Sequence, residues 1–164
     1  MTIPHNEFID RLEISDLLSR YFRAIDDKGL DLTIVEATFL EDGRVVRPNG
    51  SALNGWQEIL DGQNTSFARF RATHHVITDH VIDIQGDTAK LQANVTAMHL
   101  WGYEHLDPNS LDSHFLAGGV LTALAKRTSD GWRFSEMTNR NVWRTGTGFA
   151  TMLAITTLHN RPDK

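Results

Sequence analysis

The chain has 164 residues, of which 40% are apolar, and this is enough for one compact domain with its own hydrophobic core. Its formal net charge of -5 disfavours nucleic acid and anionic membranes as partners, because both attract basic protein surfaces. The sequence has no Cys, which excludes disulfides and thiolate chemistry and is consistent with a reducing compartment. We therefore expect a single domain over residues 1–164.

The N-terminal segment argues against export. MTIPHNEFIDRLE carries acidic residues early and lacks a basic region followed by an apolar stretch, so no signal peptide is predicted. No part of the sequence approaches the roughly 18 consecutive apolar residues that a transmembrane helix needs. We expect a cytoplasmic, globular protein that binds neither nucleic acid nor membrane.

The first third of the chain has helical periodicity. Within 14–25 the apolar residues recur at i, i+3, i+4, i+7, i+8 and i+11, which predicts an amphipathic helix. Gly29 is placed to end this helix, and Asp31 is placed to cap a second helix that extends through Phe39. The other elements predicted here are a turn at 41–43, a short strand at 44–47 and a third helix at 56–70.

In the second half the hydrophobic period changes from 3.6 to 2, which is typical of β-strands. Helices followed by long antiparallel strands is the α+β order, in which helices cover one face of a curved sheet. The interior of such a fold is apolar, so an inward polar side chain needs a partner and becomes a candidate for function. The predicted strands are 76–84 and 88–101, joined at 85–87, and 114–127 and 132–143, joined at 129–131, with a polar loop at 103–112.

His99 is the clearest inward polar residue. Alternation along the strand 88–101 places it on the apolar face, and the small Ala93 and Ala97 leave room beside it. This arrangement favours a pocket wall. A core histidine that is hydrogen-bonded to a backbone carbonyl is the alternative, and the sequence leaves both open.

Three more histidines lie in the segment 71–87. With a period of 2, His75 shares a face with Asp79, whereas His74 and His80 lie on the other, more apolar face. We expect His75 to point inward and the other two to face solvent or a partner chain, with the reverse orientation left open. Because alternate residues face opposite sides, these side chains cannot converge on one ion, and no metal is expected.

A carboxylate at the end of the first helix is the candidate partner for an inward imidazole. Asp26 follows Phe22 by four residues and lies at the edge of the apolar stripe, whereas Asp27 turns away. Such a carboxylate fixes the tautomer of an imidazole and favours proton uptake near neutral pH, without any cofactor. A solvated helix end is the alternative for Asp26. Tyr21 is a secondary candidate as a hydroxyl donor, although its helical angle directs it toward the core.

The candidates for substrate binding lie near the ends of two strands. They are Trp101, Asn139, Trp143 and Arg144. The two tryptophans have an alternative role as core or interface anchors. Apolar Met98 lies on an otherwise polar strand face, which predicts a sheet contact in a homodimer or homotrimer.

Several segments, in order and spacing, resemble the SnoaL-like branch of the NTF2-like superfamily. They are DRLEISDLLSRYFRAIDDKGLD at 10–31, THHVITD at 73–79, GDTA at 86–89 and DGWRF at 130–134. The resemblance implies a cone-shaped, cystatin-like α+β barrel with helices on a curved mixed sheet, often dimeric or trimeric. The sequence is most similar to the scytalone dehydratase and dehydrochlorinase branches, and this likeness implies a catalytic Asp26 and His75 with His99 as a second histidine.

One segment departs from the family pattern. GGVLTALAKR at 118–127 has Val120 and Leu121 where a polar side chain is often found, so no further polar donor is evident. The basic residue that receives a leaving group in dehydrochlorinase-like proteins corresponds to Arg140 or Arg144.

These observations predict a cofactor-independent lyase or isomerase acting on a small, mostly apolar oxygenated ring or polyketide-like molecule. His75, oriented by Asp26, would abstract a proton, and His99, with Tyr21, would donate one to the departing or developing oxygen. Two alternatives stay open: a non-catalytic ligand-binding or assembly module of the same fold, and an epoxide-opening hydrolase, which needs a further carboxylate and an Arg in the cavity.

Overall fold

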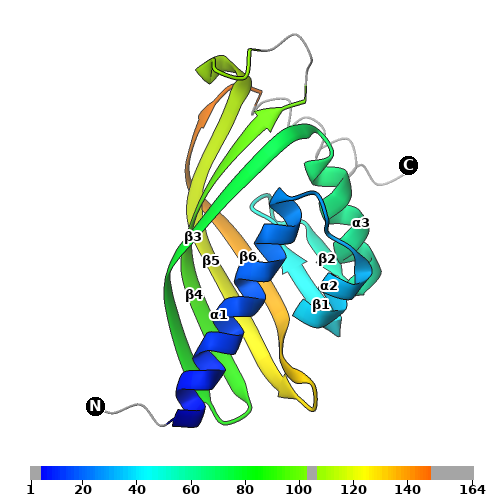
Figure 1. The fold of residues 1–164 in the computed structure, drawn as a ribbon, viewed down its shortest axis with the longest axis vertical. Helices are drawn as coiled ribbons and strands as arrows, with labels where there is room; N and C mark the ends of the chain where they lie inside the picture. Colours follow the sequence, from blue (N-terminus) through cyan, green and yellow to red (C-terminus); the bar gives the residue numbers. More distant parts are fainter. Residues whose placement is uncertain (1–4, 103–106, 149–164) are drawn as a thin grey trace.

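The computed structural model describes residues 5–102 and 107–148, with helices and strands in the predicted α+β order (Figure 1). The helices are α1 (His5–Asp26), α2 (Leu32–Thr38) and α3 (Gly55–Phe67), with a short 3-10 helix η1 (Leu111–Ser113). The strands are β1 (Phe39–Val46), β2 (Ala52–Asn54), β3 (Phe70–Gln85), β4 (Thr88–Trp101), β5 (His114–Thr128) and β6 (Gly131–Gly146). Of the predicted loop at 103–112, residues 103–106 lie outside the described residues.

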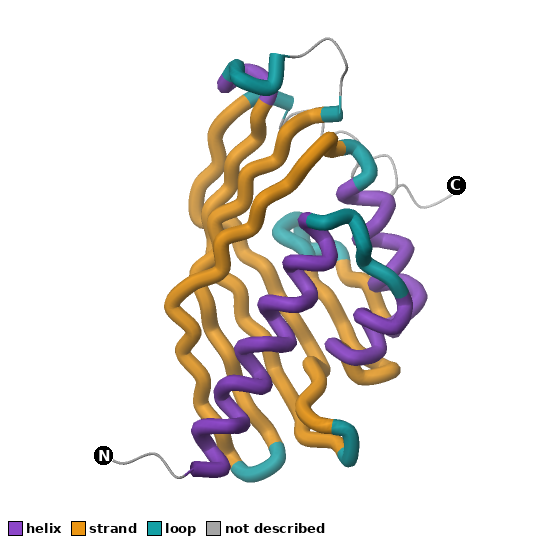
Figure 2. Tube along the Cα trace, viewed as in Figure 1, coloured by secondary structure: helices purple, strands orange, loops and turns teal. Residues whose placement is uncertain are grey.

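The six strands form one mixed sheet in the order β2-β1-β6-β5-β4-β3. Strands β1 and β6 run parallel, and the other neighbouring strands are antiparallel. The long strands bend around helix α1, while α2 and α3 lie beside β1 and β2 (Figures 1 and 2). The structure therefore has the curved mixed sheet with helices on one face that the sequence predicted.

The boundary between α2 and β1 differs from the prediction. Phe39 was expected in the second helix, but it has φ -118° and ψ 154° and begins β1. Its ring is fully buried, 5.1 Å from the ring of Tyr21 and 6.1 Å from that of Phe134. Residues 41–43, predicted as a turn before the strand, lie within β1, where the pairing with β6 is irregular. Tertiary packing of an aromatic residue has here overridden the local helical pattern.

Two more boundaries shift. Lys28 takes the left-handed φ of 56° beyond the end of α1, and its amide donates to the carbonyl of Ile25, whereas Gly29 was expected to end the helix. Helix α3 ends at Phe67, three residues earlier than predicted, because Phe70 already pairs with Trp101 at the start of β3. Strand β2 was not predicted at all, since three residues carry too little periodicity.

A β-bulge explains why periodicity left the facing of β3 unresolved. Thr78 pairs with Asn94 and Val81 with Gln92, so two residues of β3 lie opposite one of β4. Asp79 has a left-handed φ of 56° at this point. The extra residue reverses the alternation, so side chains on both sides of the bulge can face the core although their sequence positions differ in parity.

The bulge corrects one of the histidine predictions. His75 faces inward and His74 is exposed, as expected. His80 was expected to face solvent or a partner chain, but it is half-buried and its Nδ1 lies 2.5 Å from the hydroxyl oxygen of Ser15 on α1. The reversed alternation after Thr78 turns this side chain toward the helix.

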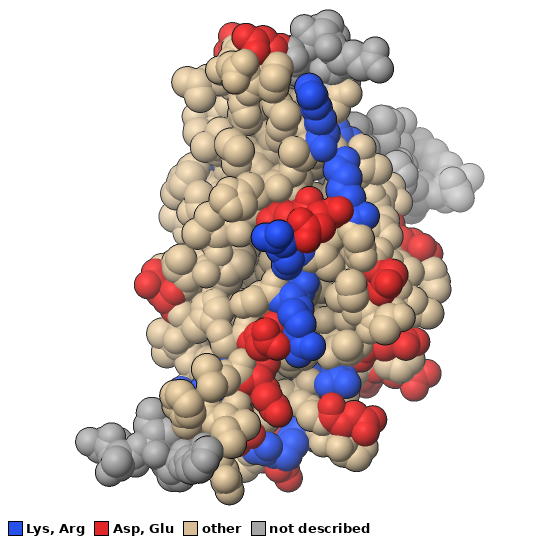
Figure 3. All heavy atoms as spheres, viewed as in Figure 1, with Lys and Arg blue, Asp and Glu red and all other residues tan. Residues whose placement is uncertain are grey.

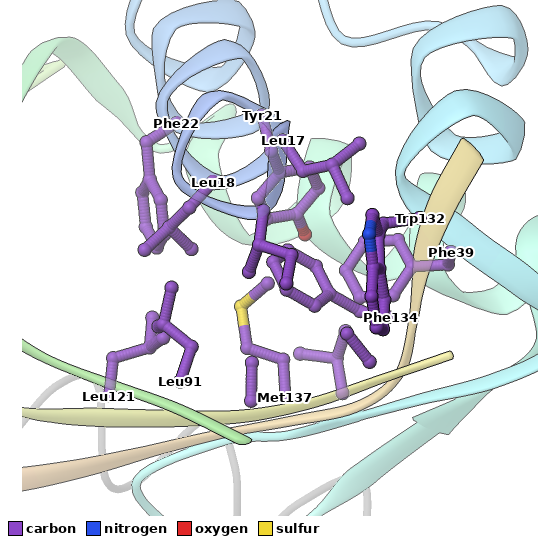
Figure 4. Close-up of a cluster of buried hydrophobic side chains, with 14 of the residues drawn as sticks. Leu17, Leu18, Tyr21, Phe22, Phe39, Leu91, Leu121, Trp132, Phe134 and Met137 are labelled. Carbon is purple, nitrogen blue, oxygen red and sulfur yellow. The ribbon is translucent and has the colours of Figure 1, made fainter. Parts of the chain in front are cut away.

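The main core lies between α1 and the concave face of the sheet (Figure 4). Leu18 of α1 is fully buried, and so are Leu91 of β4 and Leu121 of β5. The other labelled side chains are Leu17, Tyr21, Phe22, Phe39, Trp132, Phe134 and Met137. This packing fixes α1 across the sheet, so the position of the helix end relative to β3 is set by the core.

An ion pair joins the N-terminal part of α1 to the second hairpin. Arg127 donates from Nη1 and Nη2 to the two carboxylate oxygens of Asp10, at 2.6 and 2.7 Å. The indole nitrogen of Trp132 donates to the same carboxylate at 3.0 Å, and the guanidinium lies 4.5 Å from the ring centre. The hydrogen bond from Arg127 lowers the pKa of Asp10.

Within the described residues, no helix has the length and apolar character to cross a membrane.

Candidate active site

A cavity of about 240 Å³ lies between the helices and the inner face of the sheet. Its apolar wall combines aliphatic side chains with four aromatic ones, Phe22, Phe67, Phe70 and Phe115. Its polar side chains come from α3, from the segments that follow β1 and α3, and from the long strands: Arg47, Asn49, Gln63, Ser66, Arg69, His75, His99, Asn139, Asn141 and Arg144. A mostly apolar space with a few polar groups is typical of small-molecule sites.

Asp26 and His75 meet at this cavity. Nδ1 of His75 lies 2.7 Å from Oδ1 of Asp26, and the His75 backbone amide donates to Oδ2 at 2.8 Å. The hydroxyl of Thr73 donates to Oδ1 at 2.7 Å. Lys28 ties the end of α1 to β3, because its Nζ donates to the carbonyl of Phe70 at 2.6 Å. The carboxylate is therefore held by three hydrogen bonds from one strand.

These contacts fix the charge of Asp26 and the tautomer of His75. Burial raises the pKa of Asp26, but the hydrogen bonds from His75 and Thr73 outweigh it and lower this pKa to about 2. An ionised carboxylate only accepts hydrogen bonds, so Nδ1 of His75 carries the proton. The other ring nitrogen, Nε2, then carries the lone pair. The His75 side chain is 5% exposed and belongs to the cavity lining, whereas Asp26 lies behind it.

His99 is held as a neutral imidazole. Its Nδ1 lies 3.2 Å from the backbone carbonyl oxygen of Phe115, which only accepts, so Nδ1 is the protonated nitrogen. Burial lowers the pKa of His99 to about 4, and the neighbouring His75 contributes to this shift. The sequence left two roles open for His99, a pocket wall and a histidine that is hydrogen-bonded to a carbonyl. The structure shows both, since His99 is bonded to the Phe115 carbonyl and also lines the cavity. A neutral His99 with its lone pair on Nε2 accepts a hydrogen bond, and it does not donate one from that nitrogen.

The two imidazoles share one aromatic surrounding. Their rings lie 5.6 Å apart at 87° to each other. The ring of Phe67 stacks on His99 at an interplanar angle of 12° and meets His75 edge-on. Phe22 lies 4.9 Å from His75 on the other side. Because the two imidazoles are fixed by this packing, they lose little conformational entropy when a ligand binds. The surrounding apolar rings also strengthen electrostatic interactions at the imidazoles.

Tyr21 lies in the core and does not line the cavity. Its hydroxyl oxygen accepts a hydrogen bond from Nε2 of Gln63 at 2.7 Å, and burial raises its pKa. Tyr21 therefore points toward the core, as its angle on the predicted helix indicated. In this position its hydroxyl does not reach the cavity directly, and Gln63 stands between them as a lining residue.

The predicted substrate-binding residues divide into two groups. Asn139 and Arg144 line the cavity, as expected. Trp101 is buried outside the lining, where its indole nitrogen donates to the carbonyl of Thr147 at 2.9 Å. Trp143 also lies outside the lining, is 46% exposed, and covers Gly118, at which a Cβ would lie 2.2 Å from its ring. Both tryptophans therefore lie outside the described lining, and their contact with substrate stays a prediction.

Sequence reasoning missed the basic residues that directly follow β1 and α3. Arg47 and Arg69 line the cavity, but Arg69 was placed in a predicted helix and Arg47 in a short strand without assigned facing. One signal was available: in 44–47 the alternation puts Arg47 on the same face as Val45, which is buried. The argument that identified His99 would have identified Arg47 as well.

The described residues also bear on a metal site. In residues 5–102 and 107–148, no group of three or more His, Asp or Glu side chains is placed to hold a metal ion. His74 and His75 face opposite sides of β3, whereas the bulge turns His80 to the same side as His75.

Comparison with known proteins places this architecture in a family. The sequence model of the SnoaL-like domain family matches residues 6–138 of this chain. The structure of the Kfla4162 protein from Kribbella flavida is 27% identical, covers 85% of this chain and 95% of its own, and has a TM-score of 0.74. No curated protein matched the chain by sequence.

Two more distant structures share the fold. A putative scytalone dehydratase from Novosphingobium aromaticivorans is 17% identical, with a TM-score of 0.73, 87% of this chain and 90% of its own covered. A type 2 hexachlorocyclohexane dehydrochlorinase is also 17% identical, with a TM-score of 0.74 and coverage of 87% and 91%. At this identity the likeness establishes the fold alone.

Proposed function

The chain belongs to the SnoaL-like family of the NTF2-like superfamily, and we propose that it is a cofactor-independent lyase or isomerase with His75 as its base. In the proposed reaction, Nε2 of His75 removes a proton from carbon next to an activating group of a small oxygenated ring or polyketide-like substrate. The observation that carries this proposal is the 2.7 Å hydrogen bond between Asp26 and His75 at the wall of an apolar cavity.

The Asp26–His75 pair has the features that a general base needs. Asp26 is ionised at neutral pH, since its pKa is about 2, and it holds the proton on Nδ1. In the neutral imidazole the lone pair therefore lies on Nε2, where it can accept a proton from the substrate. When the imidazole takes up the substrate proton, the positive charge develops next to the carboxylate, which stabilises it. The proton then returns to the leaving group in a lyase, or to another carbon in an isomerase.

His99 receives a different role from the one predicted by the sequence. A neutral imidazole whose Nδ1 faces a carbonyl oxygen offers only a lone pair to the cavity. We therefore propose that Nε2 of His99 accepts a hydrogen bond from a substrate hydroxyl and so positions the substrate carbon against His75. His99 is therefore not the proton donor that we expected from the sequence.

The alternatives find less support. A module that only assembles with other proteins has no need for an open cavity, and here Asp26 lies within hydrogen-bond distance of His75 beside about 240 Å³ of space. An epoxide-opening hydrolase needs a carboxylate as well as an Arg in the cavity. The described lining residues include arginines but no Asp or Glu. The names of the two distant fold relatives agree with lyase chemistry.

The test is turnover of a panel of cyclic hydroxyketones and chlorinated rings in D2O. Mass spectrometry detects loss of water or HCl and deuterium incorporation at carbon. We expect His75→Gln to lower the rate about 10² to 10⁴-fold, the usual contribution of a general base. His74→Gln is the matched control, because His74 is the neighbouring histidine on the exposed face of β3. Turnover that survives in His75→Gln would place the base elsewhere, and ligand binding without any turnover would favour the binding module.

A further inference from the structure

We propose that the ligand of this cavity carries a carboxylate, and that Arg47 and Arg69 bind it. The statement that this ligand is a substrate rests on the proposed function, whereas the anion site itself can be tested by binding alone.

The charge of the cavity is opposite to that of the protein. The chain has 21 acidic and 16 basic residues, and basic and acidic side chains lie close together over α1 in Figure 3. The described residues of the cavity lining instead include Arg47, Arg69 and Arg144, with no Asp or Glu. Asp26 is engaged by His75 and Thr73. Arg47 and Arg69 are half-buried and Arg144 is exposed, so a ligand that supplies a negative charge is stabilised most by the first two.

Arg47 has an unused donor inside the protein. Its Nη2 donates to the carbonyl oxygen of Gly62 at 2.7 Å, which fixes the plane of the guanidinium. Its Nε is buried and has no hydrogen-bond partner among the described residues. A buried donor without an acceptor is costly, so stability alone does not explain the position of the Arg47 side chain at the cavity. Burial lowers the pKa of Arg47, and the charge of Arg69 acts in the same direction.

The backbone of α3 leaves room for this guanidinium. A Cβ at position 62 would lie 2.7 Å from Nη2 of Arg47 and 2.5 Å from Cδ2 of Leu53. A larger residue at this position would push aside the ends of the Arg47 and Leu53 side chains. Gly62 of α3 thus leaves room for the guanidinium of Arg47, which follows β1.

The chemistry of the lining selects a carboxylate among anions. The planar guanidinium fork of Arg matches the two oxygens of a carboxylate. Four Phe side chains and a volume of about 240 Å³ suit a small ring attached to that group. We expect an aromatic or alicyclic carboxylic acid whose ring contacts the Phe side chains while its carboxylate contacts Arg47 and Arg69.

The experiment is calorimetric titration of the full chain with pairs of ring carboxylates and their neutral carboxamides, such as 2-naphthoate and 2-naphthamide. The pairs have one to three rings and nearly equal shape, so the difference in Kd reports the charge. We expect the carboxylate to bind about tenfold or more tightly in the best pair, which is the size of a hydrogen bond to a charged group. Arg47→Met and Arg69→Met should remove this preference and leave carboxamide binding within about twofold.

Two controls keep the outcome decisive. Arg44→Met changes a neighbouring arginine of β1 that is exposed and paired with Glu136 at 3.7 Å, so the preference should persist. His75→Gln should also keep it, which separates anion binding from the proposed base. The proposal is overturned if no carboxylate in the panel binds better than its carboxamide, if Arg47→Met keeps the preference, or if inorganic phosphate binds more tightly than every carboxylate. Should Arg47→Met fail to fold, Arg47→Gln, which also removes the charge, must show the same loss of preference.

Discussion

The most informative single change is Asp26→Asn, because it keeps the shape of the side chain and removes its charge. Asp26 accepts from the backbone amide of His75 through Oδ2, and from the His75 ring and the Thr73 hydroxyl through Oδ1. An asparagine offers one oxygen and one NH₂ group in the same positions. The NH₂ group, which is a donor, must therefore face either the His75 backbone amide or the His75 ring and the Thr73 hydroxyl, where the carboxylate offered an acceptor.

The backbone decides which orientation the asparagine takes. The His75 amide is 2.8 Å from Oδ2 and cannot become an acceptor, so the amide oxygen belongs on that side. The NH₂ group then faces the imidazole and the Thr73 hydroxyl. The hydroxyl can rotate to accept, and the imidazole can accept only if its proton moves from Nδ1 to Nε2. The variant is thus expected to keep the fold and to reverse the tautomer of His75, with the lone pair turned away from the cavity.

The expected magnitude follows from the loss of the base. In serine protease triads the corresponding change lowers kcat about 10⁴-fold through the wrong tautomer, which is about 5.5 kcal/mol in the barrier. Because His75 depends on Asp26 in the same way, we expect a loss of about 10³ to 10⁴-fold. His74→Gln, on the opposite face of β3, should keep full activity.

Nitrogen-15 NMR of the labelled protein measures the tautomer without any substrate. The wild-type spectrum should show the His75 proton on Nδ1, and Asp26→Asn should show it on Nε2. If the variant kept the Nδ1 proton, or lost less than about tenfold in turnover, the hydrogen bond to Asp26 would not control the base, and the mechanism would need a different orienting group.

The remaining predictions concern stability and assembly. Between pH 6.5 and 4 the free energy of unfolding should fall by about 3 kcal/mol, since His99, with a pKa of about 4, takes up its proton only on unfolding. Urea titrations at stepped pH measure this fall, and His99→Gln should lack the part that His99 contributes. From pH 4 to 2 a further loss of about 2 kcal/mol is expected, because Asp26, with a pKa of about 2, stays ionised only in the folded chain. An equal loss in Asp26→Asn would contradict that assignment. Arg127→Met should cost about 2 kcal/mol in the same assay, as it leaves the carboxylate of Asp10 buried without its cation, and a change below about 0.5 kcal/mol would argue against a structural role for this pair. If the outer sheet face joins subunits, Met98→Glu should lower the mass measured by light scattering, and a monomeric wild type would remove that expectation.

The periodicity of the sequence was sufficient where one face of an element is buried along its whole length. Helix α1 was recognised because its apolar residues recur at helical spacing, and β4 because its buried and exposed residues alternate without interruption. The same alternation placed His99 on the inner face, and the structure finds it there. Local patterns of this kind are determined by the chain itself, since they reflect which side of one element must leave water.

Only the tertiary structure decided how those elements meet. The bulge at Asp79 inverts the alternation of β3, so no periodicity argument could give both His75 and His80 their observed facing. The distance between Asp26 and His75 depends on how α1 packs across the sheet, and the convergence of Arg47 and Arg69 depends on where α3 lies beside β1. The sequence therefore determined which residues are available for chemistry, whereas packing between distant segments determined which of them share a cavity.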